Sequence, residues 1–167
     1  KPVLYICNVD EELAAGQQEN QYIAKVKEKA REESAEVVII CGKLEEELSQ
    51  LDDSSRDEMI TDLGMTEPGL NRMIRAGYEI LGLHTYFTAG EKEVRAWTIK
   101  LGDTAPAAAG KIHSDFERGF ICAEVYDLKD LLKVGSKTKL KEQGLLRLEG
   151  RDYVMHDGDI VEFRFNV

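Results

Sequence analysis

The sequence lacks any apolar run approaching the roughly 20 residues that a membrane-spanning helix needs. It also has no stretch with the composition of a secretory signal peptide. With 43% hydrophobic and 32% charged residues, its composition is that of a soluble globular protein. Its 167 residues leave room for one medium domain or two small ones. We therefore expect a cytoplasmic protein with no membrane partner.

Cysteine is scarce. The three residues, Cys7, Cys41 and Cys122, are odd in number, and each lies in an apolar, strand-like run. Their spacing matches no metal site. The pattern is typical of reduced, buried thiols in a cytosolic protein, so we expect no disulfide and no metal ligand among them.

The sequence also lacks an excess of positive charge. Residues 1–82 carry 9 basic and 18 acidic residues, and residues 83–167 carry 13 and 14. A net charge of −9 excludes nucleic-acid binding by bulk electrostatics in the first half. The second half, near neutrality, has only local patches for such a contact. We expect no DNA partner.

The N-terminal third has the pattern of a β-α-β unit. Residues 3–7 and 37–41 are apolar runs typical of strands buried on both faces of a parallel sheet, and the segment after Glu11 to about residue 34 has helical spacing. Ligands of such sheets bind just beyond the carboxyl ends of the strands. Asn8, Val9 and Glu11 follow the first strand there.

The four residues at 8–11 have the spacing of the Asn-Lys-x-Asp sequence with which GTPases recognise guanine. In that sequence the aspartate accepts hydrogen bonds from the ring N–H and the exocyclic amine of guanine, whereas adenine has an acceptor at the ring position. Here Glu11 is one methylene longer, and Val9 replaces the lysine that would cover the base. The amide of Asn8 can both donate to and accept from an adenine edge. These changes remove the reason to prefer guanine.

A second loop follows the second strand, at Cys41, Gly42 and Lys43. A small residue followed by glycine lets backbone N–H groups approach a ligand closely. Both loops also have a purely structural interpretation: Asn8 and Glu11 as an N-cap and first-turn acid, and residues 41–43 as a strand-to-helix turn. The coincidence of two such features at successive strand ends favours a ligand site.

The rest of the chain divides near residue 83. Before it, residues 52–55 supply capping chemistry for a helix that ends at Gly64, and Pro68 begins another helix with a Met and Leu stripe that we expect in the core. After it, strands are predicted at 83–87, 94–99 and 120–126, with helices at 104–110 and 128–143, the latter broken at Gly135. The Asp-Gly pair at 157–158 predicts a hairpin between strands at 153–156 and 160–165. This order is that of a ubiquitin-like β-grasp.

Several segments spread over the whole chain have a distinctive residue order. They are Asn-Val-Asp-Glu at 8–11, Cys-Gly-Lys at 41–43, Tyr-Phe-Thr-Ala-Gly at 86–90, Glu-Val-Arg-Ala-Trp-Thr-Ile at 93–99, Ala-Ala-Gly-Lys-Ile-His at 108–113, Asp-Phe-Glu-Arg-Gly-Phe at 115–120, Asp-Gly-Asp-Ile at 157–160 and Phe-Asn-Val at 165–167. With these segments the sequence resembles the Obg-like ATPases, the YchF family. The resemblance implies a P-loop NTPase G domain followed by a TGS domain of β-grasp fold. It also implies binding and hydrolysis of ATP in preference to GTP, with Mg²⁺, and association with the ribosome or its RNA.

Carried over residue by residue, the resemblance makes Asn8 and Glu11 the family's Asn-x-x-Glu base-recognition motif, with Val9 beside the nucleotide. Cys41, Gly42 and Lys43 become the second base-contacting loop; the cysteine departs from the small pair that is usual there. We expect residues 1–82 to be the C-terminal part of the G domain and residues 83–167 to be the TGS domain.

The sequence contains no Gly-x-x-x-x-Gly-Lys-Ser/Thr motif and no Asp-x-x-Gly that could reach Mg²⁺. It also begins at Lys1 rather than at a methionine. We expect the phosphate cradle and the metal ligands to precede Lys1 in a longer protein. Phosphoryl transfer depends on those parts, so we expect no catalytic residue in this chain and no ATP hydrolysis by it alone.

Candidate RNA or ribosome contacts lie in the second half, where the segment 129–141 has a net charge of +4. The candidates are Arg95, Lys100, Lys111, Arg118, Lys133, Lys137, Lys139 and Lys141. Solvated helix faces explain such a charge run equally well. Trp97 and Phe116 are candidates for stacking on bases, although strand alternation places Trp97 in the core. We expect His113 to be a capping or hydrogen-bonded histidine.

Two hypotheses follow from the sequence. In the first, the chain supplies adenine recognition and a docking domain to a ribosome-associated ATPase. In the second, it is a non-catalytic RNA or protein interaction module in which Asn8 and Glu11 only cap a helix.

Overall fold

The computed structural model describes residues 1–16, 20–90 and 93–166. Val167, the last residue of the family-like segment at the C-terminus, lies outside this description. The chain divides into two compact units, Lys1–Leu81 and Gly82–Val167. Each unit is described by itself.

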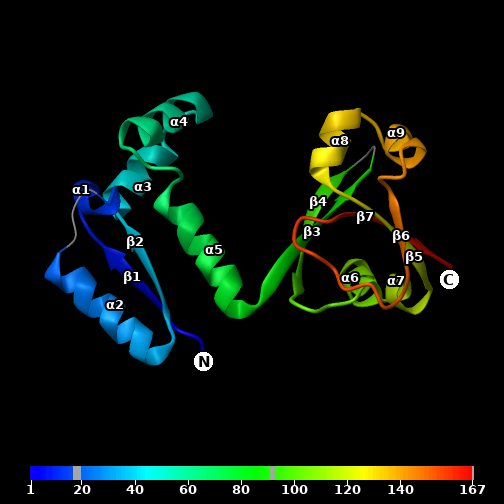
Figure 1. Cartoon of the computed structure of the whole chain (residues 1–167), viewed down its shortest axis with the longest axis horizontal. Coiled ribbons are helices and arrows are strands. Elements are labelled where there is room, and N and C mark those ends of the chain that lie inside the picture. Colours follow the sequence, from blue (N-terminus) through cyan, green and yellow to red (C-terminus); the bar gives the residue numbers. More distant parts are fainter. Residues whose placement is uncertain (17–19, 91–92, 167) are drawn as a thin grey trace. The chain divides into compact units, whose positions relative to one another are not determined.

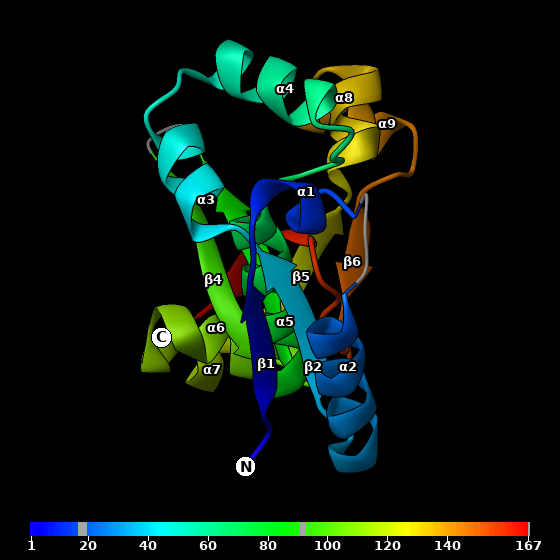
Figure 2. The same ribbon diagram turned by 90° about the vertical axis from the view of Figure 1, so that its left-hand side faces the viewer.

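The first unit is an α/β unit (Figure 1). Its elements in chain order are β1 (Leu4–Asn8), α1 (Glu11–Ala14), α2 (Gln21–Glu33), β2 (Glu36–Ile40), α3 (Gly42–Ser49), α4 (Asp53–Asp62) and α5 (Gly69–Leu81). The strands β1 and β2 pair in parallel, from Leu4 opposite Glu36 to Asn8 opposite Ile40. Figure 2 shows the two strands side by side with α2 alongside. The predicted β-α-β unit is confirmed.

The single helix predicted after Glu11 is wrong, because the segment holds two helices. Gly16 has a left-handed φ of 74°, which ends the first helical turn. Asn20 then begins α2 as its N-cap, where its side-chain oxygen accepts from the backbone N–H groups of Tyr22 and Ile23. Residues 17–19, within the predicted helix, lie outside the described residues.

The expectation that β1 is buried on both faces is wrong for this unit, since Ile6 is 47% exposed. Leu70 and Ile74 of the α5 stripe, which we expected in the core, are also exposed. The sheet has two strands in the described residues, which is too few to cover all of this apolar surface. On the side of β2, Arg72 of α5 donates a hydrogen bond from Nη2 to the carbonyl of Ile39 at 3.0 Å.

A small core holds α3 and α4 against the β-α-β unit. Its buried members are Ala14, Cys41, Leu44, Leu48 and Ile60. All three cysteines are free thiols, as predicted, but only Cys41 is buried. Cys7 and Cys122 are half-buried, so their predicted full burial is wrong.

The second unit contains a five-stranded sheet. Its elements are β3 (Leu83–Ala89), β4 (Val94–Lys100), α6 (Ala105–Ile112), α7 (Ser114–Arg118), β5 (Phe120–Tyr126), α8 (Leu128–Val134), α9 (Lys137–Glu142), β6 (Arg147–Glu149) and β7 (Ile160–Phe165). The strand order is β4-β3-β7-β5-β6. Within this unit, α6 and α7 lie together on one side, and α8 and α9 lie together away from them (Figures 1 and 2).

The Ala-rich helix α6 packs on one face of this sheet. Ala105, Ala108 and Ala109 are fully buried, and small side chains let the helix approach the strands closely. The hydroxyl of Tyr86 on β3 donates to the carbonyl of Ala108 at 2.8 Å. Burial raises the pKa of Tyr86, so its hydroxyl keeps its proton. A sheet curled on one helix is the predicted β-grasp.

The hairpin predicted around Asp157 and Gly158 is wrong. Residues 153–156 form no strand, apart from an isolated bridge between Val154 and Thr104. β7 pairs instead with β5, antiparallel, and with β3, parallel. The Asp-Gly turn itself is present, with a φ of 85° at Gly158, but Asp157 accepts from the backbone N–H of Thr85 on β3. The turn therefore anchors the loop to β3.

Two short elements have no counterpart in the sequence prediction. β6 pairs with β5 through three residues, too few for a visible alternation. The helix α7 begins at His113, whose Nδ1 accepts from the backbone N–H of Asp115 at 3.2 Å. This contact confirms the predicted capping role of His113.

Candidate functional site

The two loops predicted to contact a base lie side by side at the carboxyl edge of the parallel strands. The backbone N–H of Val9 donates to the carbonyl of Ile40 at 2.8 Å, which extends the pairing of β1 and β2 by one step. Just beyond, Oδ1 of Asn8 accepts a hydrogen bond from the backbone N–H of Gly42 at 2.9 Å. The structure thus brings together residues 34 positions apart in the chain.

This hydrogen bond fixes the orientation of the Asn8 amide. Oδ1 accepts the hydrogen bond from the N–H of Gly42, so the amide nitrogen Nδ2 points the other way. Asn8 is exposed. A Cβ built on Gly42 would lie 3.4 Å from Oδ1 of Asn8, so a glycine keeps this edge open. The amide nitrogen of Asn8 therefore presents its two N–H donors to an acceptor placed at the strand ends.

Glu11 and Lys43 form an ion pair across the same edge. Nζ of Lys43 lies 3.2 Å from Oε1 of Glu11 and 3.5 Å from Oε1 of Glu47. The hydrogen bond to Glu11, followed by the negative charges of both glutamates, raises the pKa of Lys43. Since the Lys43 side chain is 73% exposed, the pair orients the Glu11 carboxylate but adds little to stability.

The helix cap in this region is a different residue from the one considered in the sequence. Asp10 is the N-cap of α1 and accepts from the backbone N–H of Leu13 at 3.0 Å. Glu11 is the first residue of α1. Asn8 does not cap α1; its hydrogen bond goes to the first residue of α3.

Val9 and Cys41 lie behind the edge. Cys41 is buried in the small core, and Val9 packs against the same cluster. Cys41 precedes α3 as its N-cap without any side-chain capping bond. Only the backbone of Cys41 is therefore available for a contact at the edge, and the half-buried Val9 supports the turn that carries Asn8.

A cavity of about 350 Å³ opens next to this edge, a volume within the range of small-molecule sites. Its lining residues are Cys7, Asn8, Val9, Asp10, Leu13, Asn20, Tyr22, Ile23 and Val26. Asn8 and Val9, two of the residues predicted to contact the base, thus line this cavity.

The eight cationic side chains predicted to contact RNA or the ribosome do not behave alike. Nη2 of Arg118 lies on Asp115 in a short ion pair, and the Arg95 guanidinium lies 4.1 Å from the ring centroid of Trp97. Lys137 contacts two carboxylates. The remaining five are exposed: Lys100, Lys111, Lys133, Lys139 and Lys141.

Lys137 belongs to an ion-pair network around the buried Glu124 that the sequence did not reveal. Its Nζ lies 2.7 Å from Oε2 of Glu124, whose side chain is only 6% exposed. Glu162 and Arg164 complete the network, with Glu162 on Lys137 and Arg164 on Glu124. The hydrogen bond from Lys137 lowers the pKa of Glu124. A glutamate within the apolar run of β5 was the available signal.

The two aromatic residues considered for base stacking are held by other rings. Phe116 stacks on Phe165 with centroids 3.7 Å apart. Trp97 stacks on Tyr86 at 6.5 Å, and its Nε1 donates to Oγ1 of Thr88. Both line a cavity of about 500 Å³ and pack against the core of the second unit. The predicted core position of Trp97 is confirmed in part, since the ring is half-buried.

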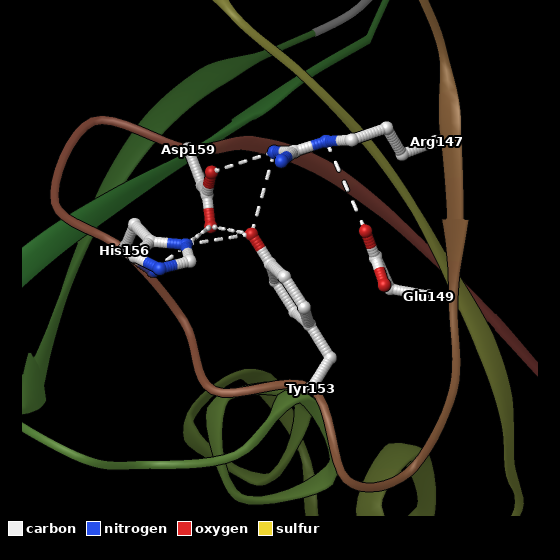
Figure 3. A network of polar contacts seen from close by, with 5 residues as sticks. All are labelled: Arg147, Glu149, Tyr153, His156 and Asp159. Atoms are coloured by element: carbon white, nitrogen blue, oxygen red, sulfur yellow. Dashed lines mark hydrogen bonds and ion pairs between the residues drawn. The ribbon is translucent and has the colours of Figure 1, made fainter.

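A polar network closes the loop before β7 (Figure 3). The buried Asp159 accepts from the hydroxyl of Tyr153 and from the backbone N–H of His156, both at 2.9 Å. Arg147 lies 3.4 Å from Asp159. Because the Tyr153 hydroxyl donates to Asp159, Nδ1 of His156 donates to that hydroxyl. Burial and the hydrogen bond to Asp159 raise the pKa of Tyr153, so its hydroxyl keeps the proton that it donates to Asp159.

No metal site is visible in the described part of the chain. Its His, Cys, Asp and Glu residues form no group of three or more that could hold an ion. Within the same residues, no helix combines the length and apolar character needed to cross a bilayer.

Comparison with known proteins gives matches over the whole chain. The family model YchF-GTPase_C, described as a protein of unknown function (DUF933), matches residues 83–166. The "Ribosome-binding ATPase YchF" of Haemophilus influenzae is 53% identical over 167 residues, and that of Bacillus subtilis is 51% identical. These alignments cover 100% of this chain but 45% and 46% of the relatives. The chain therefore spans less than half the length of these two relatives.

Solved structures with the same fold exist. The Schizosaccharomyces pombe YchF GTPase matches with a TM-score of 0.83 and 34% identity, covering 98% of this chain and 43% of that one. A GTP binding protein from Pyrococcus horikoshii OT3 matches with a TM-score of 0.65 at 16% identity, a likeness of fold alone. The predicted fold class, the end of a parallel-sheet G domain followed by a β-grasp domain, is confirmed.

Proposed function

The chain belongs to the YchF family, and we propose that it is the base-recognition and docking part of a ribosome-associated P-loop ATPase. In this proposal the longer protein acts in the cytoplasm and binds and hydrolyses ATP, with Mg²⁺, in preference to GTP. Relatives that are about half identical are named ribosome-binding ATPases, which supports both the nucleotide and the partner. Residues 1–82 are then the C-terminal part of the G domain, and residues 83–167 the TGS domain.

One observation carries the nucleotide part: the hydrogen bond between Oδ1 of Asn8 and the N–H of Gly42. It joins the Asn-x-x-Glu turn and the Cys-Gly-Lys loop at the edge where parallel sheets bind ligands. Two residues that only ended their strands would not need a side-chain hydrogen bond between the two loops. The contact leaves the amide nitrogen of Asn8 for the base.

The adenine preference rests on the geometry of the acidic residue. An aspartate at position 11 would have the reach to accept two hydrogen bonds from guanine, whereas Glu11 is longer and its carboxylate pairs with Lys43. The amide of Asn8 donates to a ring nitrogen acceptor of adenine. Val9, half-buried behind Asn8, supports the turn, and the backbone at Cys41 and Gly42 approaches the ligand.

The phosphate chemistry is assigned to the rest of the longer protein. Transfer of the γ-phosphoryl group needs a phosphate cradle and metal-bound oxygen ligands, and the sequence contains no P-loop motif. The chain's own residues bind and orient the base and thereby select the nucleotide. We propose that residues 1–167 alone do not hydrolyse ATP.

The second unit is proposed as the docking domain for the ribosome. Its five exposed lysines, at 100, 111, 133, 139 and 141, are available for phosphate or acidic groups. Lys137 is proposed to hold the fold rather than the partner, since it neutralises the buried Glu124. Arg95 and Arg118 are already engaged within the unit.

A second candidate is an interaction module without a nucleotide role. It is favoured by the fact that Asn8 already has a structural partner in Gly42. The two candidates predict different effects of Asn8→Ala in the longer protein. Loss of ATP binding with ribosome binding intact supports base recognition, whereas unchanged ATP binding supports the module.

The proposal is tested by calorimetric titration of ATP and GTP, with Mg²⁺, into residues 1–167 and into the longer protein. We expect ATP binding by the longer protein, weaker GTP binding, and no tight binding by residues 1–167. Tight binding of ATP by residues 1–167 would contradict the assignment of the phosphate site to another part of the protein.

A further inference from the structure

The helix α8 displays two leucines that the core of its unit does not use. Leu128 is 53% exposed and Leu132 is 75% exposed. They are four residues apart, so they lie one turn apart on the same face of the helix. Exposed apolar side chains are ordinary when scattered singly, whereas adjacent ones on one face form an apolar patch that a partner can cover.

Other side chains of α8 already have their partners. Val134 is buried in a cluster with Tyr126, Leu140 and Ile160, and Leu131 packs against that cluster. The helix is therefore attached through its inner face. Leu128 and Leu132 lie on the outer side and are not needed to hold α8 on the sheet.

Two lysines lie next to these leucines on the outer side. Lys129 and Lys133 follow Leu128 and Leu132 by one residue each, and both are exposed. No ion pair to either lysine is present among the described residues, whereas Lys137 is neutralised by Glu124 and Glu162. The α8 face, defined as Leu128, Lys129, Leu132 and Lys133, thus combines an apolar row with an unneutralised basic row.

We propose that the α8 face docks an acidic, amphipathic protein helix. Leucines on such a helix cover Leu128 and Leu132, and its carboxylates pair with Lys129 and Lys133. Helix-on-helix contact through apolar residues at i and i+4, with charges at the margin, is a common mode of segment recognition. The charge complementarity also gives the contact its orientation.

RNA fits this face less well. Phosphates pair with lysines, but leucine side chains offer neither a donor for phosphate nor an aromatic ring on which a base can stack. Burying the two leucine side chains under RNA would stabilise the complex little, whereas a protein helix offers apolar atoms that contact both leucines. This proposal rests on the ribosome docking proposed above and names a protein segment as the partner that contacts α8. The test of the α8 face needs no nucleotide.

The test uses residues 1–167 and two fluorescent peptides of 18 residues, measured by anisotropy. Both contain the same glutamates and leucines; one has its leucines on a single helical face, and in the other their order is scrambled. We expect the amphipathic peptide to bind at least about tenfold more tightly than the scrambled one. Leu128→Gln with Leu132→Gln should weaken that binding at least about tenfold, and so should Lys129→Glu with Lys133→Glu.

The matched control is Leu148→Gln, because Leu148 is 68% exposed on β6 of the same unit. It should leave binding unchanged, and circular dichroism should show all variants folded. Equal binding of the two peptides, or an unchanged affinity of the double leucine variant, would overturn the proposal. A 20-nucleotide single-stranded RNA serves as the competing probe: RNA binding that falls with the leucines replaced would assign the face to RNA. Cosedimentation of the longer protein with ribosomes is measured separately, so that ribosome docking can stand even if the peptide result is negative.

Discussion

Oδ1 of Asn8 accepts a hydrogen bond from the backbone N–H of Gly42 at 2.9 Å, across 34 positions of sequence. The two residues end neighbouring parallel strands, so this one bond sets the spacing of both loops at the edge of the sheet. It also orients the Asn8 amide with its nitrogen free for an acceptor. Base recognition in our account depends on that orientation.

Gly42→Ala tests how closely a ligand approaches this edge. A Cβ at position 42 would lie 3.4 Å from Oδ1 of Asn8, an ordinary contact that the fold tolerates but that fills the approach to the backbone. We expect ATP affinity of the longer protein to fall about tenfold, about 1.4 kcal/mol, with little change in melting temperature. Gly77→Ala on α5, where a Cβ meets nothing within 4 Å, is the control. Equal ATP affinity in both variants would remove the close approach from the account.

Gly119→Ala tests the closure of the β-grasp unit. A Cβ at position 119 would lie 2.1 Å from the carbonyl oxygen of Asn166. The backbone of Asn166 cannot easily move away, because its N–H donates to the carbonyl of Gly119 at 2.9 Å. The clash must shift the C-terminal end of β7, so we expect a loss of about 1–3 kcal/mol or more in the free energy of unfolding. Gly150→Ala, with open space around it, should be nearly neutral in the same thermal melts. A Gly119→Ala protein as stable as that control would show that β7 does not end as described.

The buried Glu124 predicts a specific acid sensitivity. Lys137 and Arg164 lower its pKa in the folded state, below the value of about 4.3 expected in the unfolded chain. Its stabilising contribution is therefore complete above about pH 4.5 and disappears as the pH falls through the folded-state pKa. Glu124→Gln should cost about 1–3 kcal/mol at pH 7, and the difference from wild type should shrink below about pH 4. Urea titrations from pH 7 to pH 3 measure this, with the exposed Glu142→Gln as control. A difference that is constant with pH would mean that the charge of Glu124 is not what stabilises the unit.

The lysines of α8 and α9 should separate into docking and structural residues. Reversal of Lys133, Lys139 and Lys141 to glutamate should weaken ribosome cosedimentation of the longer protein and reduce its salt dependence. These side chains are exposed, so the melting temperature should change little. Lys137→Glu should instead lower the melting temperature, because it places a third carboxylate beside Glu124 and Glu162. Ribosome binding that ignores both salt and the three exposed lysines would exclude this patch as a docking surface.

The sequence predicted the elements whose signal is local. The apolar runs predicted β1, β2 and β5 almost to the residue. Residues 52–55 were correctly expected to cap α4, where Asp52 accepts from the N–H of Ser55. The helix after Glu11 was overextended because a left-handed glycine and an N-cap at Asn20 override helical spacing of the apolar residues. These are backbone events that periodicity does not register.

Errors in the second unit come from long-range pairing. The Asp-Gly pair does form a turn, but Asp157 and Gly158 bind Thr85, 72 or more positions away, instead of closing a local hairpin. The ion pair of Lys137 with Glu124 was missed for the same reason, since its carboxylate partner lies on another element. In the first unit, the two loops proposed to contact the base were each predicted by position at a strand end. The contact between Asn8 and Gly42 depends on the register in which β1 and β2 pair, and local sequence patterns do not show that register.

The most direct test of base recognition is the ratio of ATP to GTP affinity in the longer protein, measured by calorimetry for wild type and for Val9→Lys combined with Glu11→Asp. The double variant restores the lysine stem and the shorter carboxylate of the guanine-binding sequence. We expect GTP affinity to rise and ATP affinity to fall, so that the ratio drops by tenfold or more, about 1.4 kcal/mol. An unchanged ratio would contradict the assignment of nucleotide selection to the edge formed by Asn8, Glu11 and Gly42.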